Sequence, residues 1–487
     1  MSPRSSKINE VTGTQDSYFL VTWDCEDDPE NPYNWAFSKR CYVTVLAAML
    51  VLNAAFASSA TSGVSESIGK SLGFSPSVGG LLISLFVAGY CVGPLLWGPL
   101  SEAYGRRPIL VLSFAGLFGS QIGCALSRNK ATLFSFRFLA GCFAASPFST
   151  SGAIMTDLWQ PYDRGHAMAA FAAVPFGGQT LGPIVSGLVE ASSSSWRWVF
   201  WILSFVSGAS LVLILISIPE TYGPRILELK ARRLRMETGN ARWLTSKGLN
   251  DTPFGTRVGG ILLKPWRMFF QEPVLIAINA YVAFCTGLIY LLFGAYPIVF
   301  GVGHGFDATK TGLMFIPVFV GGGFSCLAVA LYFNPLYIRA TRIRAPLQVP
   351  PEERLPMGMI GSVLLTVSLF WFGWTSVPSI SFWAPASAGT LLAFSLTLIF
   401  LSLINYIADV YTEVAASALA TNTVCRSLVA AAFPLFATKM YTSLEPKWAS
   451  TILGCIALLF MPMPLLFMRY GPYLRSKSRY SPSNRSP

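Results

Sequence analysis

The stretch Gly98-Pro99-Leu100-Ser101-Glu102-Ala103-Tyr104-Gly105-Arg106-Arg107-Pro108 separates two long apolar runs, Val78–Trp97 and Ile109–Leu126. A segment of about 20 apolar residues is long enough to cross a membrane as a helix. The two runs are therefore predicted to be neighbouring transmembrane helices. The stretch between them is predicted to be a tight loop at the membrane surface.

Glycine and arginine residues define the character of this loop. Gly98 and Gly105 allow a close backbone approach and a positive φ angle. Arg106 and Arg107 cannot enter hydrocarbon without a large cost, which places the loop on the cytoplasmic side of the membrane. Glu102 lies close enough in the sequence to reach the two arginines.

The composition of the whole chain is that of a membrane protein. Of its 487 residues, 53% are hydrophobic and only 12% are charged, which is too apolar for a soluble enzyme. The net charge of +12 does not indicate nucleic-acid binding, because the charges lie between apolar runs. Twelve runs are long enough to span a bilayer. They are Cys41–Ala60, Val78–Trp97, Pro108–Leu126, Thr132–Met155, His166–Val189, Trp198–Ile218, Pro273–Phe293, Thr311–Phe333, Met357–Trp374, Ala384–Tyr406, Val414–Tyr441 and Trp448–Met468.

These runs predict an all-α membrane protein with twelve transmembrane helices in two six-helix bundles. The long polar segment after the sixth run divides the chain. We expect a cytoplasmic N-terminal tail at 1–40, a first bundle at 41–218, a cytoplasmic central loop at 219–272, a second bundle at 273–470 and a cytoplasmic C-terminal tail at 471–487.

The positions of lysine and arginine predict the orientation. With both termini in the cytoplasm, 26 of the 35 lysines and arginines fall in cytoplasmic segments and seven fall in external loops. Such an excess is typical of the cytoplasmic side. The remaining two, Arg137 and Arg426, fall inside predicted spans.

The loop after the second span resembles the G-x-L-[ST]-[DE]-x-x-G-R-[RK] signature of the major facilitator superfamily. The resemblance implies a gating latch, in which the acid caps the N-terminus of a helix in the other half and holds the arginine. A plain topology anchor is the alternative interpretation. The latch residues would be Gly98, Glu102, Gly105, Arg106, Arg107 and Asp157.

The fifth span contains a row of small residues. Gly178, Gly182 and Ser186 recur every four residues, so one helix face is nearly bare and a second helix can pack closely against it. Pro183 permits a bend. With Gly187, the run resembles the G-x-x-x-G-P-x-x-G signature of the antiporter branch of the same superfamily. Ordinary small-residue packing is the alternative.

The fourth span contains Arg137 in a run that resembles the R-x-x-x-G pattern of the superfamily, where this arginine is linked to proton coupling. A charge at that depth is costly unless it faces a wet cavity or a partner, and snorkelling to the outer surface is the alternative. Arg426 is the other intramembrane arginine. Three side chains would help to bind cargo beside them: Gln179, Tyr290 and Asn422.

No carboxylate lies near the middle of a predicted span, since Asp157, Glu190, Asp409 and Glu413 all fall near span ends. The cavity would therefore supply positive charge, which favours a neutral or anionic cargo over a polycation. This leaves Asp157 and Glu102 as the candidate proton carriers.

Further motifs resemble the twelve-span fungal drug:proton antiporter family over residues 28–475. They include Trp196–Trp201, Pro219–Tyr222, Trp371–Ser376 and Ala415–Asn422. The resemblance implies a plasma-membrane transporter that exports a small organic molecule in exchange for protons, among membrane lipids and as a monomer. A dedicated organic-acid exporter serving a biosynthetic pathway and a transporter-like nutrient sensor remain alternatives. We expect no enzyme activity and no cofactor, because no nucleophile–base pair or metal cluster lies near a span end. We expect no metal site, because the nine cysteines form no C-x-x-C pair.

Three polar segments outside the predicted spans also carry structural predictions. The N-terminal tail, with an acidic cluster at Asp24–Asp28, is predicted to be mostly disordered. The central loop carries basic residues from Arg225 to Arg235 interleaved with leucine, which predicts an amphipathic helix on the inner leaflet. In the second half, the counterpart of the Gly98 loop should follow the eighth span, around Arg339–Arg344.

Overall fold

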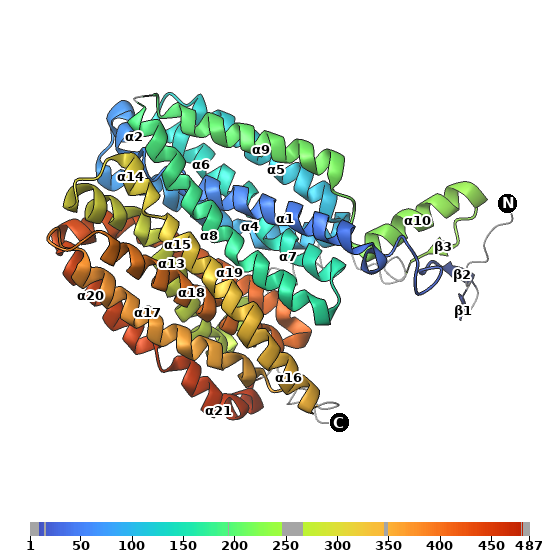
Figure 1. Cartoon of the computed structure of the whole chain (residues 1–487). Coiled ribbons are helices and arrows are strands. Elements are labelled where there is room, and N and C mark those ends of the chain that lie inside the picture. The colour runs from blue at the N-terminus through green and yellow to red at the C-terminus, as the bar shows by residue number, and fades with distance from the viewer. Residues whose placement is uncertain are drawn as a thin grey trace.

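The computed structural model describes residues 9–13, 16–192, 194–245, 266–344, 349–478 and 480. Its first half is built from helices that alternate in direction (Figure 1, blue to green). They are α1 (Phe37–Ser59), α2 (Ser65–Leu72), α3 (Pro76–Gly79), α4 (Leu81–Tyr104), α5 (Arg106–Ala125), α6 (Lys130–Ala144), α7 (Ser146–Leu158), α8 (Pro161–Ala191) and α9 (Arg197–Ser217).

The second half lies beside the first (Figure 1, yellow-green to red). Its elements are α13 (Pro273–Tyr296), η2 (Pro297–Gly303), α14 (Ala308–Leu313), α15 (Ile316–Ala328), η3 (Val329–Phe333), α16 (Asn334–Arg344), η4 (Pro351–Arg354), α17 (Leu355–Thr375), α18 (Trp383–Val410), η5 (Thr412–Val414), α19 (Ala415–Ser443), α20 (Glu445–Phe460) and α21 (Met463–Lys477).

Many of these helices are long and apolar enough to cross a membrane, which confirms the expected all-α membrane architecture. Within the described ranges, ten helices pass that test, and the two parts of α4, which meet at 43°, form an eleventh candidate. The count of twelve stays a prediction. The loop expected at Gly98–Pro108 is shorter than predicted, because α4 continues to Tyr104 and α5 begins at Arg106.

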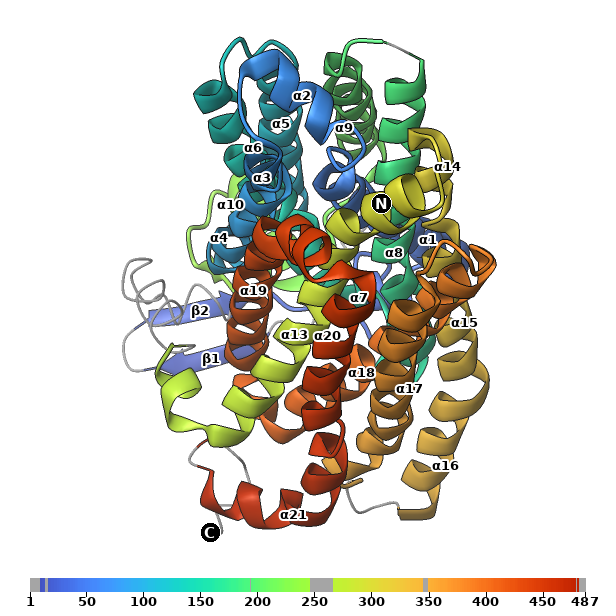
Figure 2. The same cartoon turned by 90° about the vertical axis from the view of Figure 1, so that its left-hand side faces the viewer.

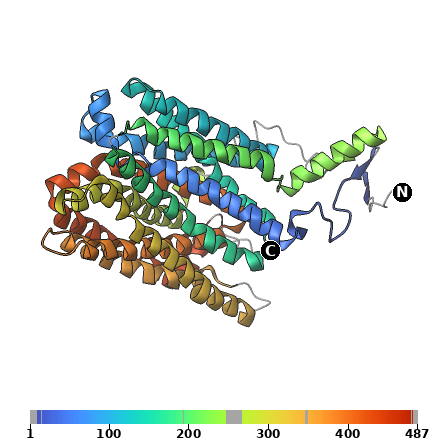
Figure 3. The same cartoon turned by 45° about the horizontal axis from the view of Figure 1, so that its top comes forward.

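The end of the bundle that carries the start of α1 also carries a small extension. Strands β1 (Asn9–Gly13) and β2 (Asp16–Leu20) are antiparallel, and β2 pairs in parallel with β3 (Trp243–Leu244). Helix α10 (Gly223–Thr238) extends away from the ends of the spans, as Figures 1 and 3 show, whereas we expected it to lie on the inner leaflet. The part of the tail that the structure describes is also folded, contrary to the disorder predicted from composition.

The first half meets the second half mainly along helices α4 and α8. Figure 2 shows α4 beside α19 and α8 beside α14 and α15, and these pairs pack directly. At the end opposite the termini, a Cβ on Gly80 would lie 2.5 Å from the carbonyl oxygen of Pro434, and a Cβ on Gly312 would lie 2.5 Å from that of Pro183. A Cβ on Gly187 would overlap with the backbone of Ala308. Backbone touches backbone here, so this end is closed.

The small-residue face of α8 packs as its sequence predicts. A Cβ added at Gly178 would overlap with the backbone of Leu52, and one at Gly182 would overlap with Ser59, both on or beside α1. The two helices therefore approach closely because these positions lack side chains.

This packing can be tested with one added methyl group. Gly182→Ala should destabilise the protein by about 1–3 kcal/mol, because overpacking forces the two backbones apart. The matched control is Gly119→Ala, since a Cβ at Gly119 meets no atom within 4 Å. The measurement is the Tm of the purified protein in detergent. Equal Tm values for the two variants would contradict the close packing of α1 and α8.

Candidate functional site

A single glycine joins α4 to α5 at the end of the bundle that carries α10. Gly105 has a φ angle of +102°, which residues other than glycine rarely adopt. A Cβ there would also overlap with the carboxylate of Glu220. Both constraints require glycine at this position. At Gly98, by contrast, an added Cβ meets no atom within 4 Å, so the close approach expected there is not seen.

Glu220 caps the N-terminus of α5. Its carboxylate accepts the backbone N–H groups of Arg106 at 2.9 Å and Arg107 at 3.2 Å. It also accepts the backbone N–H groups of Thr221 and Tyr222 at 3.1 and 3.0 Å. A carboxylate at a helix N-terminus satisfies unpaired donors and complements the helix dipole. In the sequence, Glu220 stands out only as part of the Pro219–Tyr222 motif, and its capping role was not predicted.

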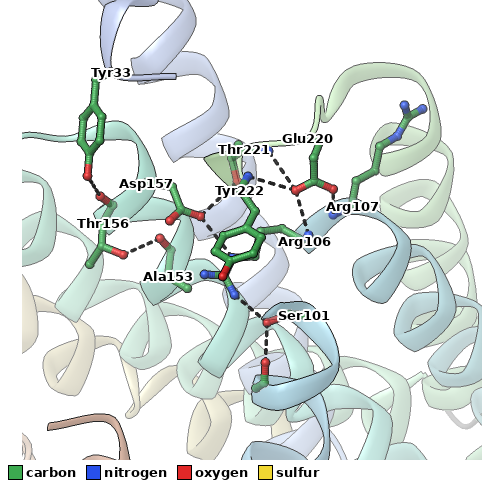
Figure 4. A network of polar contacts seen from close by, with 11 residues as sticks. Tyr33, Ser101, Arg106, Arg107, Ala153, Thr156, Asp157, Glu220, Thr221 and Tyr222 are labelled. Carbon is green, nitrogen blue, oxygen red and sulfur yellow. Dashed lines mark hydrogen bonds and ion pairs between the residues drawn. The ribbon is translucent and has the colours of Figure 1, made fainter. Parts of the chain in front are cut away.

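The Arg106 side chain forms the centre of the network drawn in Figure 4. Its Nε pairs with Oδ2 of Asp157 at 3.1 Å, and its NH1 donates to the hydroxyl of Ser101 at 2.7 Å. The guanidinium lies over the ring of Tyr222 at 4.5 Å. The two charged side chains are only 7% and 16% exposed. We call the set Arg106, Asp157, Glu220 and Tyr222 the latch.

The other expected latch residues lie around this network. Arg107 is exposed and donates from NH2 to the carbonyl of Leu215 at 2.7 Å. Glu102 is exposed on the last turn of α4. The cap that the structure shows is on α5 of the same half, whereas we expected an acid to cap a helix of the other half. Contact of Glu102 with the other half stays a prediction.

The second half repeats the ion pair. Nε of Arg354, just before α17, pairs with Oδ2 of Asp409 on the last turn of α18 at 3.1 Å. The ring of Tyr337 lies 3.4 Å from this guanidinium, much as Tyr222 lies over Arg106. Arg354, and not the run Arg339–Arg344, is therefore the counterpart of the first-half arginine. This repeat relates the two halves, although their sequences show it only faintly.

Arg137, on α6, is completely buried. Its Nε donates to the carbonyl of Leu82 at 2.8 Å, and its NH1 and NH2 donate to the carbonyls of Ala57 and Ser58 at 3.0 and 3.4 Å. Its guanidinium also lies 4.4 Å from the ring of Phe86. These bonds join α6 to α1 and α4, so the Arg137 guanidinium already has hydrogen-bond partners within the protein.

Arg426, on α19, has a different environment. Its side chain is partly exposed, and its guanidinium lies 5.3 Å from the ring of Phe400. Among the described residues, its Nε has no hydrogen-bond partner. Tyr90 and Tyr290 lie within electrostatic range of it. The Nε–H of this guanidinium is therefore available to a further group.

Tyr290 lies where the two halves meet. Its hydroxyl donates to the hydroxyl of Ser58 at 3.4 Å, across the interface, and Gln179 of α8 also lies at this hydroxyl. Arg137 and Arg426 are both within electrostatic range of Tyr290. The structure therefore brings together four of the five residues expected at the cavity or in coupling, and we call them, with Ser58 and Tyr90, the central cluster.

Asn422 lies one turn of α19 before Arg426. Its Nδ2 donates to Oδ1 of Asn279 on α13 at 2.8 Å. Within the described part of the chain, Oδ1 of Asn422 and Nδ2 of Asn279 are buried without partners. This amide pair offers one more acceptor and one more donor.

A separate crevice of about 460 Å³ is lined by Ser195, Arg197, Trp198, Trp201 and Phe205. It lies along α9 and shares no residue with the central cluster. In the described residues, no group of three or more His, Cys, Asp and Glu side chains could hold a metal ion.

Comparisons with known proteins agree with this architecture. Residues 46–434 match the model of the Major Facilitator Superfamily. The chain is 38% identical over 466 residues to a citrinin biosynthesis cluster MFS transporter of Monascus ruber, covering 95% of this chain and 93% of that protein. It is 38% identical over 477 residues to a major facilitator superfamily multidrug transporter of Aspergillus fumigatus, covering 96% of this chain and 77% of that protein.

The chain also resembles a solved transporter structure, and this similarity concerns the fold alone. The xylose transporter XylE from E. coli, in a partially occluded inward open conformation, superposes with a TM-score of 0.60 at 18% sequence identity. The alignment covers 88% of this chain and 99% of that chain.

The latch ion pair can be tested through stability. Arg106→Ala should destabilise the protein by about 3 kcal/mol, because it leaves the Asp157 carboxylate buried without its cation. Adding Asp157→Asn to Arg106→Ala should recover much of that loss, since the unpaired charge is then gone. The matched control is Arg107→Ala, which removes an exposed arginine. The measurement is the Tm in detergent, and the claim fails if all three variants behave alike.

Proposed function

The chain belongs to the Major Facilitator Superfamily, and we propose that this multi-pass secondary transporter exports a small neutral or anionic organic molecule in exchange for protons. It is a transporter and not an enzyme. The relatives that it matches along most of its length are also transporters. The names of those relatives, a multidrug transporter and a transporter of a biosynthesis cluster, support export of an organic compound.

The environment of Arg426 is the observation on which the proposed class of cargo rests. Arg426 is a half-buried residue near the meeting point of the halves, and its buried Nε has no partner among the described residues. This donor suits a carboxylate or another acceptor on the cargo. In a poorly hydrated cavity, opposite charges attract more strongly than in water, although desolvation offsets part of that gain. A polycation would be repelled.

The two intramembrane arginines have separate roles in this proposal. Arg137 holds α6 against α1 and α4 through three carbonyl oxygens, so we assign it to the structure of the first half. Arg426 takes the anionic or acceptor group of the cargo. Tyr290, Gln179 and the Asn279–Asn422 pair supply hydrogen bonds to a neutral cargo.

Proton coupling is part of the proposal. Asp157 is our main candidate for the proton carrier, because its ionised form is held by Arg106 at 3.1 Å and protonation would weaken that pair. Glu102, which is exposed on α4, is the second candidate. A proton on Asp157 would therefore loosen the latch, which links proton uptake to movement of the first half.

A dedicated organic-acid exporter is the narrower candidate. The Nε of Arg426, which has no partner among the described residues, favours it, because a guanidinium can bind a carboxylate in a bidentate manner. The range of cargo decides between the two: a multidrug exporter moves several unrelated neutral compounds, and a dedicated exporter moves one acid.

We place the transporter in the plasma membrane as a monomer with both termini in the cytoplasm. The excess of lysine and arginine on that side supports the orientation. The close backbone contacts between the halves then lie at the outer end, near Gly80 and Gly312. The protein is closed to the outside in this conformation.

The cargo prediction uses a fluorescent carboxylate, fluorescein, in inside-out plasma-membrane vesicles. We expect saturable uptake that a protonophore abolishes. Arg426→Gln should lower the rate at least tenfold. Arg426→Lys should recover only part of it, since lysine lacks the planar fork.

Arg232→Gln is the matched control, because it removes one exposed positive charge from α10. It should leave fluorescein uptake unchanged. Saturable uptake of spermidine that survives Arg426→Gln would overturn the cargo assignment, and uptake that survives the protonophore would overturn proton coupling.

The orientation has its own test. Asn250-Asp251-Thr252 matches the glycosylation pattern and lies outside the described residues. In our orientation it faces the cytoplasm, so glycosidase treatment of the protein from a fungal host should leave its mass unchanged. A mass shift mapped to Asn250 would reverse the topology.

A further inference from the structure

The segment before α1 is folded although its composition predicts disorder. We call residues 19–36 the N-terminal strap. The carboxylate of Asp28, whose residue is only 3% exposed, accepts the backbone N–H groups of Asp24 and Glu30, each at 2.9 Å. Asn34 donates from Nδ2 to the carbonyl of Asp28 at 3.1 Å and to that of Glu26. These bonds fold the strap into a compact turn around Asp28.

The strap is attached to α10. Nζ of Lys230 pairs with Asp24 at 2.8 Å and with Asp28 at 3.6 Å. The side chains of Lys230 and Asp28 are only 15% and 4% exposed, so removal of the Lys230 charge leaves the Asp28 carboxylate buried without its cation. The more exposed pair of Arg233 and Glu30, at 3.7 Å, contributes little by comparison.

The carboxyl group of Asp28 is ionised at cytosolic pH. Burial by itself raises the pKa of this carboxyl, but the two backbone N–H groups and the Lys230 ammonium outweigh burial. The pKa therefore lies below its ordinary value of 3.8, and the group is ionised at neutral pH.

A second attachment is made by backbone pairing. Residues Phe19 and Leu20 run parallel to Trp243 and Leu244, and the N–H of Val21 donates to the carbonyl of Leu244 at 2.8 Å. The rings of Phe19 and Trp243 lie 5.0 Å apart. The strap is thus bound both to α10, through Lys230, and to the segment that follows α10.

The other end of the strap reaches the latch. The hydroxyl of Tyr33 donates to the carbonyl of Thr156 at 2.9 Å, and Thr156 directly precedes Asp157 (Figure 4). The ring of Trp23 packs against Gly223, in the segment that follows Glu220 and Tyr222. The strap therefore touches both chain segments that supply partners to Arg106.

We propose that the N-terminal strap is a positioning element of the latch. It ties the end of α7, which carries Asp157, to the segment after α9, which carries Glu220. By holding these two segments together, it keeps both partners in place around Arg106. Loosening the strap exposes the latch amides and lets Asp157 and Glu220 move away from Arg106. Protonation of Asp157 then no longer controls the latch, and coupled export slows. The effect on export rests on the proposed function, whereas the effect on the latch does not.

The test measures amide hydrogen exchange of the full-length protein by mass spectrometry. Lys230→Met should speed exchange at least tenfold in residues 19–36 and in residues 104–108, whose N–H groups include those that Glu220 accepts. Lys230→Arg keeps the charge and should preserve protection in both. Glu30→Gln, which removes only the exposed pair, is the matched control and should change neither.

A second variant separates folding of the strap from its link to the latch. Tyr33→Phe removes one hydroxyl, so residues 19–30 should stay protected while exchange in residues 104–108 rises severalfold. Unchanged exchange at 104–108 in both Lys230→Met and Tyr33→Phe would overturn the proposal. Equal loss of protection throughout all helices would also overturn it, because the strap would then serve general stability.

Fluorescein uptake into vesicles gives the functional readout. Tyr33→Phe should lower the maximal rate severalfold and leave the half-saturating concentration unchanged, since the strap contacts no residue of the central cluster in the described structure. A raised half-saturating concentration at an unchanged maximal rate would contradict a role in positioning. If wild-type vesicles take up no fluorescein, the proposed function fails, and hydrogen exchange still decides on the strap.

Discussion

A charge inside an apolar bundle must be paired or must serve something that enters the bundle, and this constraint organises the molecule. Arg106 is paired with Asp157, and Arg354 is paired with Asp409. Arg137 is surrounded by three carbonyl oxygens and an aromatic ring. Arg426 differs, because its Nε has no partner among the described residues and its side chain is partly exposed. The positions of the paired charges mark one end of the bundle, and the position of Arg426 marks its centre.

The two ends of the bundle are held together by different forces. At the end opposite the termini, glycines let the backbones of the two halves touch, so van der Waals contact between the halves dominates. At the other end, the two repeated ion pairs each join helices of a single half. Such an arrangement ties the helix ends within each half, and neither of these two ion pairs joins the halves there. The strap adds a further tie to the first half, since it joins the segment before α1 to α10 and to the end of α7.

Local patterns in the sequence predicted the helices and their contacts better than they predicted the charge network. Runs of apolar residues located the helices, although some continue beyond the predicted ends, as α4 does to Tyr104. The spacing of Gly178 and Gly182 predicted close packing. Glu220 was missed because it caps α5 from 114 residues away, and one sequence does not show which distant acid will reach a helix end. The folded strap was missed because composition describes only the segment itself, whereas Asp28 is held by Lys230 on a distant helix. Arg137 and Arg426 looked equivalent in the sequence, and only the packed carbonyls around Arg137 distinguish them.

The most direct test of this account is the position of a bound carboxylate. A cryo-electron-microscopy structure of the protein with fluorescein should place the carboxylate at about 3 Å from the Arg426 guanidinium, the distance of a charge-assisted hydrogen bond. The ligand should also contact Tyr290, and the carbonyl bonds of Arg137 should remain intact. A carboxylate bound to Arg137, or fluorescein bound away from both arginines, would contradict the central claim that Arg426 provides the free positive charge of the transport site.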